Sequence, residues 1–472
     1  MPICVPSFAF RPRAPGMTLV RRVSRACVAA AAGVAVATAP IASAAQESLP
    51  IIRDAEIEGL MRIYTKPIFK AAGLQPGAVR VHLIKSRAIN AFVADGQRMF
   101  IYTGLLSSAK TPGEVMGVLS HETGHIAGGH LARLGLQMDK ASNLAIIGML
   151  LGAAAMVGGA VAGSKGGVEA GTGVMLGGPG VAQRNLLAYA RAQEAAADQA
   201  AVKFLTEAGQ SARGVLELFY KLANQSIASV QYVDPYVLSH PMPLERIRNL
   251  ERLAKASPHF DKPDPPALVL RHELMQAKLS GFLDSPQVVY RKYPPADSTL
   301  PARYARAIAA FRGGDLKNAL PLIDTLIKDI PQNPYFWELK GQALLEGGRP
   351  QEAVAPLQQA VKLLPSSGLI RLMLAQAQLG VEGSDSARAA LETLKAARRT
   401  ETDSANLHML MAKAYGRLDN LPLAELETAE MAIRRDDREL AIQKATNALK
   451  GLKQGTPEWL RANDILNYTK EE

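Results

Sequence analysis

A spacing of 34 residues, repeated through the C-terminal part, constrains the fold of this 472-residue chain more than any other feature. Small residues and prolines recur at that spacing, in the series Ala307, Gly341, Ala375, then Ala319, Ala353, Ala387, and then Pro331, Pro365. A unit of this length has room for two helices, and its small residues let the helices pack closely. The spacing therefore predicts stacked helical hairpins over residues 301–472, with a plain helical bundle as the alternative.

These units resemble the tetratricopeptide repeat, a helix-turn-helix unit whose copies stack side by side. The resemblance implies an α-solenoid with a concave surface that suits extended peptides or partner proteins. Ala412, Tyr415 and Ala424 continue the pattern after a slip of three residues. Trp459 is predicted to belong to a terminal capping helix.

The N-terminus has the composition of an export signal. Residues 11–25 contain five arginines and no acid, and an Ala/Val-rich run follows from Ala26 to Ala39. Ala42-Ser43-Ala44 has the small-x-small pattern of a cleavage site, and the apolar run is too short to span a bilayer. We predict a signal peptide over residues 1–44, cleaved near Ala44, and a periplasmic location for the remaining chain. A retained anchor helix is the alternative.

Cysteine content and charge exclude several classes of protein. Both cysteines, Cys4 and Cys27, lie in the predicted signal peptide, which excludes a disulfide scaffold and a Cys-ligated zinc ribbon. The net charge of +11 becomes smaller once the signal's arginines are removed, and no basic stripe is interleaved with aromatics. We therefore expect no nucleic-acid partner. Hydrophobic residues at 48% exclude a mainly disordered chain, and charged residues at 21% argue against a polytopic membrane protein.

The pattern most specific for chemistry is H-E-x-x-H at His121–His125, on a helix that the capping box Thr111-Pro112-Gly113-Glu114 begins. His121 and His125 are four residues apart, so both imidazoles lie on one helix face and can converge on one zinc ion. Glu122 lies beside them, where it can take a proton from a water whose pKa zinc lowers to about 7. The spacing predicts a hydrolytic zinc site; an ordinary helix with solvated side chains is the alternative.

A catalytic zinc ion takes three protein ligands and a water, so a third ligand is needed. Glu194 is the best candidate, because it shares one face of an Ala-rich helix, predicted from Leu186 to about Glu207, with Asp198. Asp198 either orients a ligating histidine from behind or donates a proton during turnover. The alternative is an exposed acid pair beside Arg191.

Together these motifs resemble peptidase family M48, whose pattern is a strand-turn-strand with Asn-Ala-Phe and Thr-Gly-Leu, an H-E-x-x-H helix, and E-x-x-A-D. Here the pattern appears as Asn90-Ala91-Phe92, Thr103-Gly104-Leu105, His121–His125 and Glu194–Asp198. The resemblance covers about residues 50–255. It implies an α+β, mostly helical chain, in which a zincin-like metalloprotease domain is followed by the α-solenoid.

The same resemblance assigns the site residues. It implies that His121, His125 and Glu194 ligate one Zn²⁺ per chain. It also implies that Glu122 is the catalytic base and that Asp198 is the proton donor.

Two further histidines lie near these motifs. His240, in His240-Pro241-Met242-Pro243, could be a fourth or regulatory metal ligand that makes the site latent, or a group that binds the oxyanion. The alternative is a turn histidine fixed by its prolines. His130 is five residues past His125, off the ligand face, so we expect a surface residue or one that contacts a ligand from outside.

The segment Leu144–Gly163 is apolar and long enough to span a bilayer. One crossing between His125 and Glu194 would place two predicted ligands on opposite sides of a membrane. We therefore favour a Gly/Ala-rich flap near the cleft and expect no stable membrane span; contact with a membrane or an unfolded client, or a membrane-embedded protease, is the weaker option. The predicted parts are residues 1–44 (signal peptide), 45–255 (peptidase), 256–300 (linker with a bridging helix at about 267–282) and 301–472 (repeats).

Two functions fit these predictions. The first is an exported zinc endopeptidase that cleaves misfolded or stalled proteins, with a repeat module that binds clients. Within the family, this order of domains implies outer-membrane β-barrel clients, the barrel-assembly machinery as partner, and possible chaperone activity. The alternative is chiefly a chaperone or adaptor, whose metal site is structural or is closed by His240.

Overall fold

The computed structural model describes residues 50–468 except positions 76, 96, 135 and 137 and the segments 139–164 and 229–234. The predicted signal peptide and the apolar segment Leu144–Gly163 lie outside the described residues. Among the helices that are described, none combines the length and the apolar character that a bilayer crossing needs.

A four-stranded sheet forms the β part of the fold, in the order β1-β2-β4-β3. Its strands are β1 (Ile51–Ile52), β2 (Arg80–Ile84), β3 (Ala91–Ala94) and β4 (Arg98–Tyr102). β2 and β4 are parallel, whereas β1 and β3 each run antiparallel to their neighbour. β3 and β4 form the predicted strand-turn-strand, with Phe92 opposite Phe100 and Asp95 at a φ of 50° in the turn. In this sheet β3 is an edge strand.

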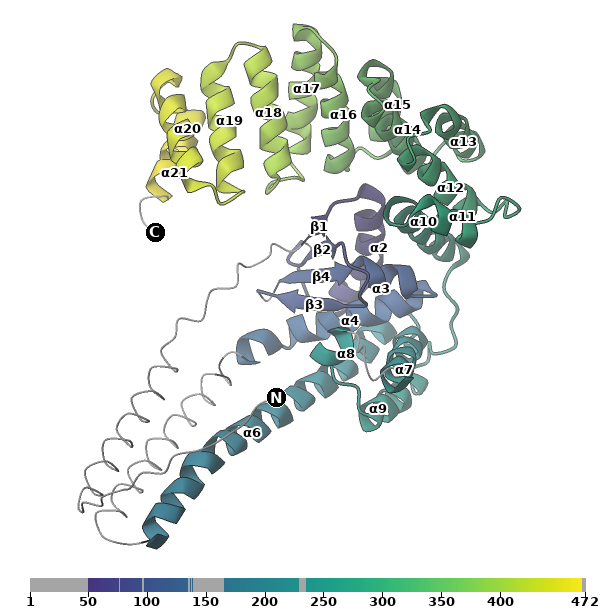
Figure 1. Cartoon of the computed structure of the whole chain (residues 1–472), viewed down its shortest axis with the longest axis vertical. Helices are drawn as coiled ribbons and strands as arrows, with labels where there is room; N and C mark the ends of the chain where they lie inside the picture. Colours follow the sequence, from purple (N-terminus) through teal and green to yellow (C-terminus); the bar gives the residue numbers. More distant parts are fainter. Residues whose placement is uncertain are drawn as a thin grey trace, which may run out of the picture. The chain divides into compact units, whose positions relative to one another are not determined.

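The described helices of the N-terminal half pack on this sheet or on one another (Figure 1). They are α2 (Ala55–Ala71), α3 (Thr103–Ser108), α4 (Pro112–Ala127), α6 (Lys165–Glu207), α7 (Arg213–Ala228), α8 (Pro235–Ser239) and α9 (Leu244–Lys255). α4 begins at the predicted cap, because the Thr111 hydroxyl accepts a hydrogen bond from the Glu114 N–H at 3.2 Å. The Glu114 carboxylate in turn accepts from the Lys110 N–H at 3.0 Å.

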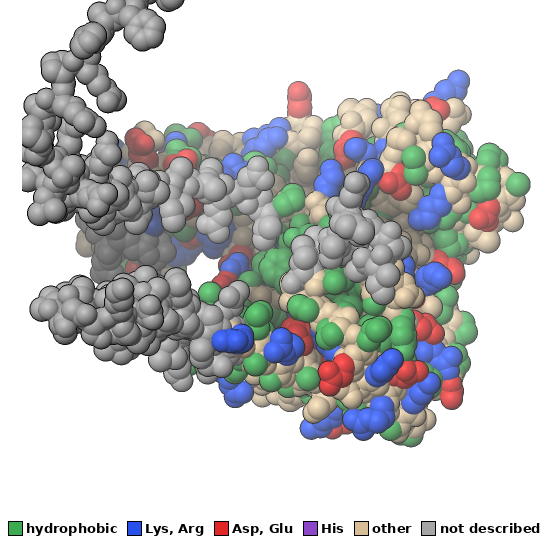
Figure 2. Space-filling model, turned by 60° about the horizontal axis from the view of Figure 1, so that its bottom comes forward, with side chains coloured by type: hydrophobic (Ala, Val, Ile, Leu, Met, Phe, Trp, Pro, Cys, Tyr) green, Lys and Arg blue, Asp and Glu red, His purple; other side chains and the backbone are tan. Residues whose placement is uncertain are grey.

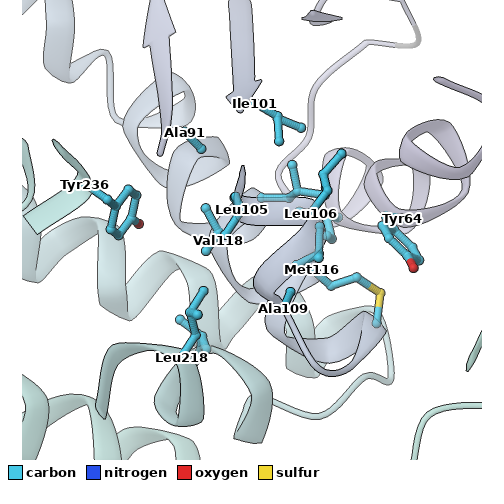
Figure 3. Packing of buried hydrophobic residues seen from close by; sticks show 14 of the residues in the cluster. Tyr64, Ala91, Ile101, Leu105, Leu106, Ala109, Met116, Val118, Leu218 and Tyr236 are labelled. Atoms are coloured by element: carbon cyan, nitrogen blue, oxygen red, sulfur yellow. The ribbon is translucent and has the colours of Figure 1, made fainter. Parts of the chain in front are cut away.

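α4 lies at the centre of the hydrophobic core. Its side chains Met116 and Val118 meet Leu105, Leu106 and Ala109 from α3 and the turn after it (Figure 3). α7 approaches α4 at backbone distance, because a Cβ on Gly214 would lie 2.1 Å from the carbonyl carbon of Gly113.

α6 ends at Glu207, as the sequence predicts, but it begins at Lys165 rather than Leu186. The added stretch is rich in glycine, which costs about 1 kcal/mol per residue in a helix relative to alanine. The many glycines therefore kept residues 165–185 from being predicted as part of the helix. α6 is the long helix in the lower part of Figure 1.

The C-terminal half consists of helical hairpins. Its helices are α12 (Leu300–Arg312), α13 (Leu316–Asp329), α14 (Pro334–Glu346), α15 (Pro350–Leu363), α16 (Gly368–Gly380), α17 (Ser384–Ala397), α18 (Ala405–Arg417), α19 (Leu421–Ile433), α20 (Arg438–Gly451) and α21 (Pro457–Tyr468). Ala319, Ala353 and Ala387, each 34 residues apart, are fully buried. A Cβ on Gly341 would lie 2.3 Å from Leu357 Cγ, so the small residue is what lets α14 and α15 pack closely. The prediction of an α-solenoid is confirmed.

α10 (Pro266–Leu283) and α11 (Pro286–Lys292) connect the two halves. α10 is the bridging helix predicted at 267–282. Met275 and Leu279 pack into the core around α4, whereas Leu274 and Ala277 pack into the core of the first repeats.

On the face shown in Figure 2, basic and acidic side chains are interspersed among hydrophobic ones.

Candidate metal centre

Four side chains from three places in the chain converge on one point. His121, His125, Glu194 and His240 each offer one donor atom, and these atoms lie within 4.8 Å of one another. The two histidines of the H-E-x-x-H pattern come from α4 and Glu194 comes from α6, whereas His240 follows α8 directly. The structure thus brings together the three residues that the sequence assigned to the metal and His240, for which a role as fourth ligand was one of the alternatives.

The distances define the geometry of the cluster. The Nε2 atoms of His121 and His125 lie 3.1 Å apart. Each lies 3.4 Å from a different oxygen of Glu194. Nδ1 of His240 lies 3.0 Å from both Glu194 oxygens and 3.4 Å from His121 Nε2. Imidazole nitrogens and a carboxylate that face one point are donors that suit a divalent transition metal.

Burial and charge perturb the acid–base properties of the cluster. Although burial lowers the pKa of His121, the carboxylates of Asp198 and Glu194 raise it overall to about 9. Burial lowers the pKa of His125 to about 2, and the neighbouring His121 charge adds to this effect. His125 is therefore neutral, which is the state in which an imidazole binds a metal.

Glu122 lies beside the cluster and is buried, with only 1% of its surface exposed. Burial raises the pKa of this carboxyl, and the charges of His240 and His121 oppose the rise. Its Oε1 lies 3.5 Å from Nε2 of His240. A carboxyl with a raised pKa is better matched to proton transfer near neutral pH than an ordinary one.

Asp198 lies on the far side of the His121 ring. Its Oδ1 is 3.0 Å from His121 Nδ1. The guanidinium of Arg246 donates to both Asp198 oxygens, at 2.7 and 2.8 Å. A further Arg246 nitrogen lies 2.8 Å from Glu194 Oε2. Burial raises the pKa of Asp198, but Arg246 and His121 outweigh it and lower the pKa overall, so the group is a carboxylate.

Sequence reasoning assigned no role to two residues that border the cluster. Arg246 bridges Asp198 and Glu194, and the His-Pro-x-Pro-x-x-Arg spacing was the available signal. Tyr236 is buried with its ring centre 4.6 Å from that of His240 (labelled in Figure 3). Within the described part of the chain, its hydroxyl has no hydrogen-bond partner. No motif pointed to this tyrosine.

The fold and the site define a metallopeptidase domain that is joined to an array of helical repeats. Residues 55–254 match peptidase family M48, and residues 304–368 and 344–414 match tetratricopeptide repeats. The chain therefore carries an M48 peptidase domain followed by tetratricopeptide repeats, and the family and the fold class predicted from the sequence are confirmed.

Several bacterial proteins are similar to this chain at modest identity. The chain is 24% identical over 377 residues to the beta-barrel assembly-enhancing protease of Yersinia pestis, covering 78% of this chain and 71% of that protein. The Escherichia coli K12 protein of the same name is 23% identical over 346 residues, covering 72% and 67%. A Vibrio cholerae protein provisionally given this name is 26% identical over 263 residues, which is 54% of this chain and 51% of that protein. The chain thus spans about half the length of the Vibrio cholerae relative.

Solved structures that resemble this chain include tetratricopeptide-repeat proteins. The crystal structure of MamA is 19% identical, covers 35% of this chain and 92% of its own, and superposes with a TM-score of 0.28. At that score, the likeness carries no argument about function.

Proposed function

We propose that this protein is an exported zinc endopeptidase whose repeats bind its protein clients. The observation that carries the proposal is the convergence of His121, His125 and Glu194 from two helices far apart in sequence. Two histidines and one glutamate are the ligand set of several zinc peptidases, in which a fourth position is left for water. The donor atoms present therefore fit zinc.

When bound, zinc supplies polarisation of the scissile carbonyl and lowers the pKa of the attacking water. Glu122 accepts the proton of that water at its carboxylate and passes it to the nitrogen of the leaving amine. The raised pKa of Glu122 suits both steps, because the group has to take up a proton and release it near neutral pH.

Asp198 orients His121 rather than donating a proton. Both of its oxygens accept hydrogen bonds from Arg246, and one also faces Nδ1 of His121. A carboxylate on the outer nitrogen of a ligating imidazole fixes the ring and increases its basicity. This arrangement supports the first of the two roles that the sequence left open.

His240 is proposed as a fourth ligand that closes the resting site. Its Nδ1 lies close to both Glu194 and His121, so a metal held there would have four protein donors and no position for water. Cleavage then requires His240 to leave. The turn over residues 240–243, with its two prolines, is the segment that would move.

The edge of β3 is the proposed position of the substrate. β3 pairs with β4 on one side and is the last strand of the described sheet on the other. It also packs against α4, which carries the site. An extended peptide added to this edge gains main-chain hydrogen bonds and passes along the helix that bears Glu122.

The names of the relatives support the choice of client and compartment. We propose a periplasmic protein, exported by a cleaved signal over residues 1–44, that acts on misassembled outer-membrane β-barrel proteins and contacts their assembly machinery. A second candidate, a chaperone or adaptor with a silent metal site, is favoured by one observation: the His240 contacts that would complete the metal's coordination.

Metal analysis and a cleavage assay of the wild type and three variants test the proposal together. We expect one zinc per chain in the wild type and in Glu122→Gln, whereas Glu194→Ala loses the metal and His240→Ala retains it with higher proteolysis. Glu122→Gln is expected to lose cleavage of an unfolded outer-membrane protein. Full cleavage by Glu122→Gln would exclude the enzyme, and absence of zinc from the wild type would exclude the metal. Loss of cleavage with preserved support of barrel assembly would show that both functions coexist.

A further inference from the structure

A pair of glycines after α4 turns the chain back towards the metal centre. α4 ends at Ala127, and Gly129 has a φ of +60°, a conformation that glycine adopts without strain. The next residue, His130, is buried with 7% of its surface exposed. The histidine that the sequence placed off the ligand face therefore lies inside the protein.

His130 contacts the outer nitrogen of His125. The two Nδ1 atoms lie 3.1 Å apart, and the rings are nearly perpendicular at 88°. The other nitrogen of His125, Nε2, faces His121 and Glu194 at 3.1 and 3.4 Å. One side of the His125 ring thus faces the candidate metal, and the opposite side faces His130.

The proton between the two Nδ1 atoms is assigned from this network. A nitrogen that binds a metal presents its lone pair, so Nε2 of His125 carries no proton and Nδ1 carries it. Nδ1 of His125 therefore donates, and Nδ1 of His130 accepts. His130 must then be a neutral imidazole with its proton on Nε2.

The His130 ring occupies space that is free because residue 128 is a glycine. A Cβ on Gly128 would lie 2.2 Å from Nε2 and 2.5 Å from Cδ2 of His130. Any side chain at position 128 would displace the imidazole from His125. The glycine pair thus has two separate purposes, one to turn the chain and one to admit the ring.

We propose that His130 is a positioning residue that holds His125 in the orientation and tautomer needed to bind the metal. The inference rests on the proposed metal site and deepens it. The two predicted histidine ligands are held differently: His121 faces the Asp198 carboxylate at 3.0 Å, whereas His125 faces a neutral imidazole. Only the first of these contacts adds negative charge to the centre.

The test measures zinc affinity of the full chain by competition with a chromophoric chelator. Removing an outer partner of a metal ligand typically weakens metal binding by about 10–100-fold. We expect a loss of that size in His130→Leu, which keeps bulk but offers no acceptor. His130→Asn places an oxygen near the position of Nδ1 and is expected to restore most of the affinity. His259→Leu, outside the site, is the matched control.

A second variant leaves His130 in place. Gly128→Ala is expected to weaken zinc binding by displacing the His130 ring. In Gly128→Ala and in His130→Leu, peptide cleavage is expected to recover at saturating zinc with an unchanged KM for the peptide. If the wild type binds one zinc and His130→Leu binds it equally tightly, the inference is wrong while the proposed function stands. If the wild type binds no zinc, both are wrong.

Discussion

Asp198 shows how a single buried carboxylate can be assigned a role from its contacts. One of its oxygens lies 3.0 Å from Nδ1 of His121 and the other is paired with Arg246, so its contacts are with a predicted ligand and an arginine. A residue of this kind acts on metal affinity, whereas a proton donor acts on turnover alone. The two roles are therefore separable by measurement.

Asp198→Asn is expected to weaken zinc binding by about 10–100-fold, because the amide can no longer support His121 as a basic ligand. The measurement is chelator competition, with kcat determined separately at saturating zinc. Glu207→Gln, an exposed carboxyl at the end of the same helix, is the control and should change neither value. Unchanged zinc affinity together with a large fall in kcat would instead assign Asp198 as the proton donor.

At the scale of elements, contact between α4 and α7 holds in place the helix that carries His121 and His125. A Cβ on Gly214 would collide with backbone atoms of Gly113 and Glu114, none of which is the flexible end of a side chain. The helices would have to separate to admit it. Overpacking of this kind typically costs about 1–3 kcal/mol.

Gly214→Ala is therefore expected to lower the midpoint of thermal unfolding of the peptidase domain, followed by circular dichroism and by metal release. Gly416→Ala in α18 is the matched control, since no atom lies within 4 Å of its added Cβ. That change should be neutral or stabilising by up to about 1 kcal/mol, because alanine favours the helix. If the two substitutions changed the midpoint of thermal unfolding equally, the close approach of α4 and α7 would not be the reason that position 214 needs glycine.

Features that neighbouring residues in the sequence determine could be predicted, and features that depend on packing between distant segments could not. The cap at Thr111, the repeats from Ala319 to Ala387 and the helix face of His121 and His125 follow from spacing alone. The start of α6 was missed, because glycines carry little helix signal. For His130 the sequence left two alternatives open, a surface residue or one that contacts a ligand from outside, because the glycine turn after α4 breaks the helical period from which its position would follow. The strand order, with β4 between β2 and β3, is likewise set by tertiary pairing.

At the scale of the whole molecule, one buried lysine connects the peptidase domain to the repeats. Lys278 of α10 lies 2.8 Å from Asp54 and 3.4 Å from Glu56, at the start of α2, and 3.7 Å from Glu338 of α14. Tyr304 of α12 donates to Glu56 at 2.9 Å. The Lys278 ammonium group thus lies close to three carboxylates, which come from both halves of the chain.

Lys278→Met is expected to destabilise the folded chain strongly, because it leaves the carboxylates buried without a positive charge. Breaking a buried ion pair in this way costs roughly 3–5 kcal/mol. Limited proteolysis between the two halves and thermal unfolding measure the effect, and Lys317→Met at an exposed position is the control. A loss no larger than that of the control would show that Lys278 is not needed to hold the junction.

The same junction predicts how stability depends on pH. Burial raises the pKa of Glu338 to about 7, Lys278 opposes the rise, and Asp54 and Glu56 add to it. Tyr304 and Tyr335 are the other titratable groups near these carboxylates, and burial raises both of their pKa values.

In the unfolded chain a glutamate has a pKa of about 4.3, so the folded chain binds an extra proton between that pH and about 7. The contribution of Glu338 to stability is therefore fully present below about pH 4.3 and is lost as the pH rises through about 7. Glu338→Gln stays neutral and is expected to flatten this slope in the free energy of unfolding, whereas the exposed Glu352→Gln should leave it intact. Because the lost proton leaves a charge between α2, α10 and α14, the two halves should also become more susceptible to proteolysis above pH 7 in the wild type and in Glu352→Gln, but not in Glu338→Gln. Identical slopes in the wild type and Glu338→Gln would mean that another group titrates at the junction.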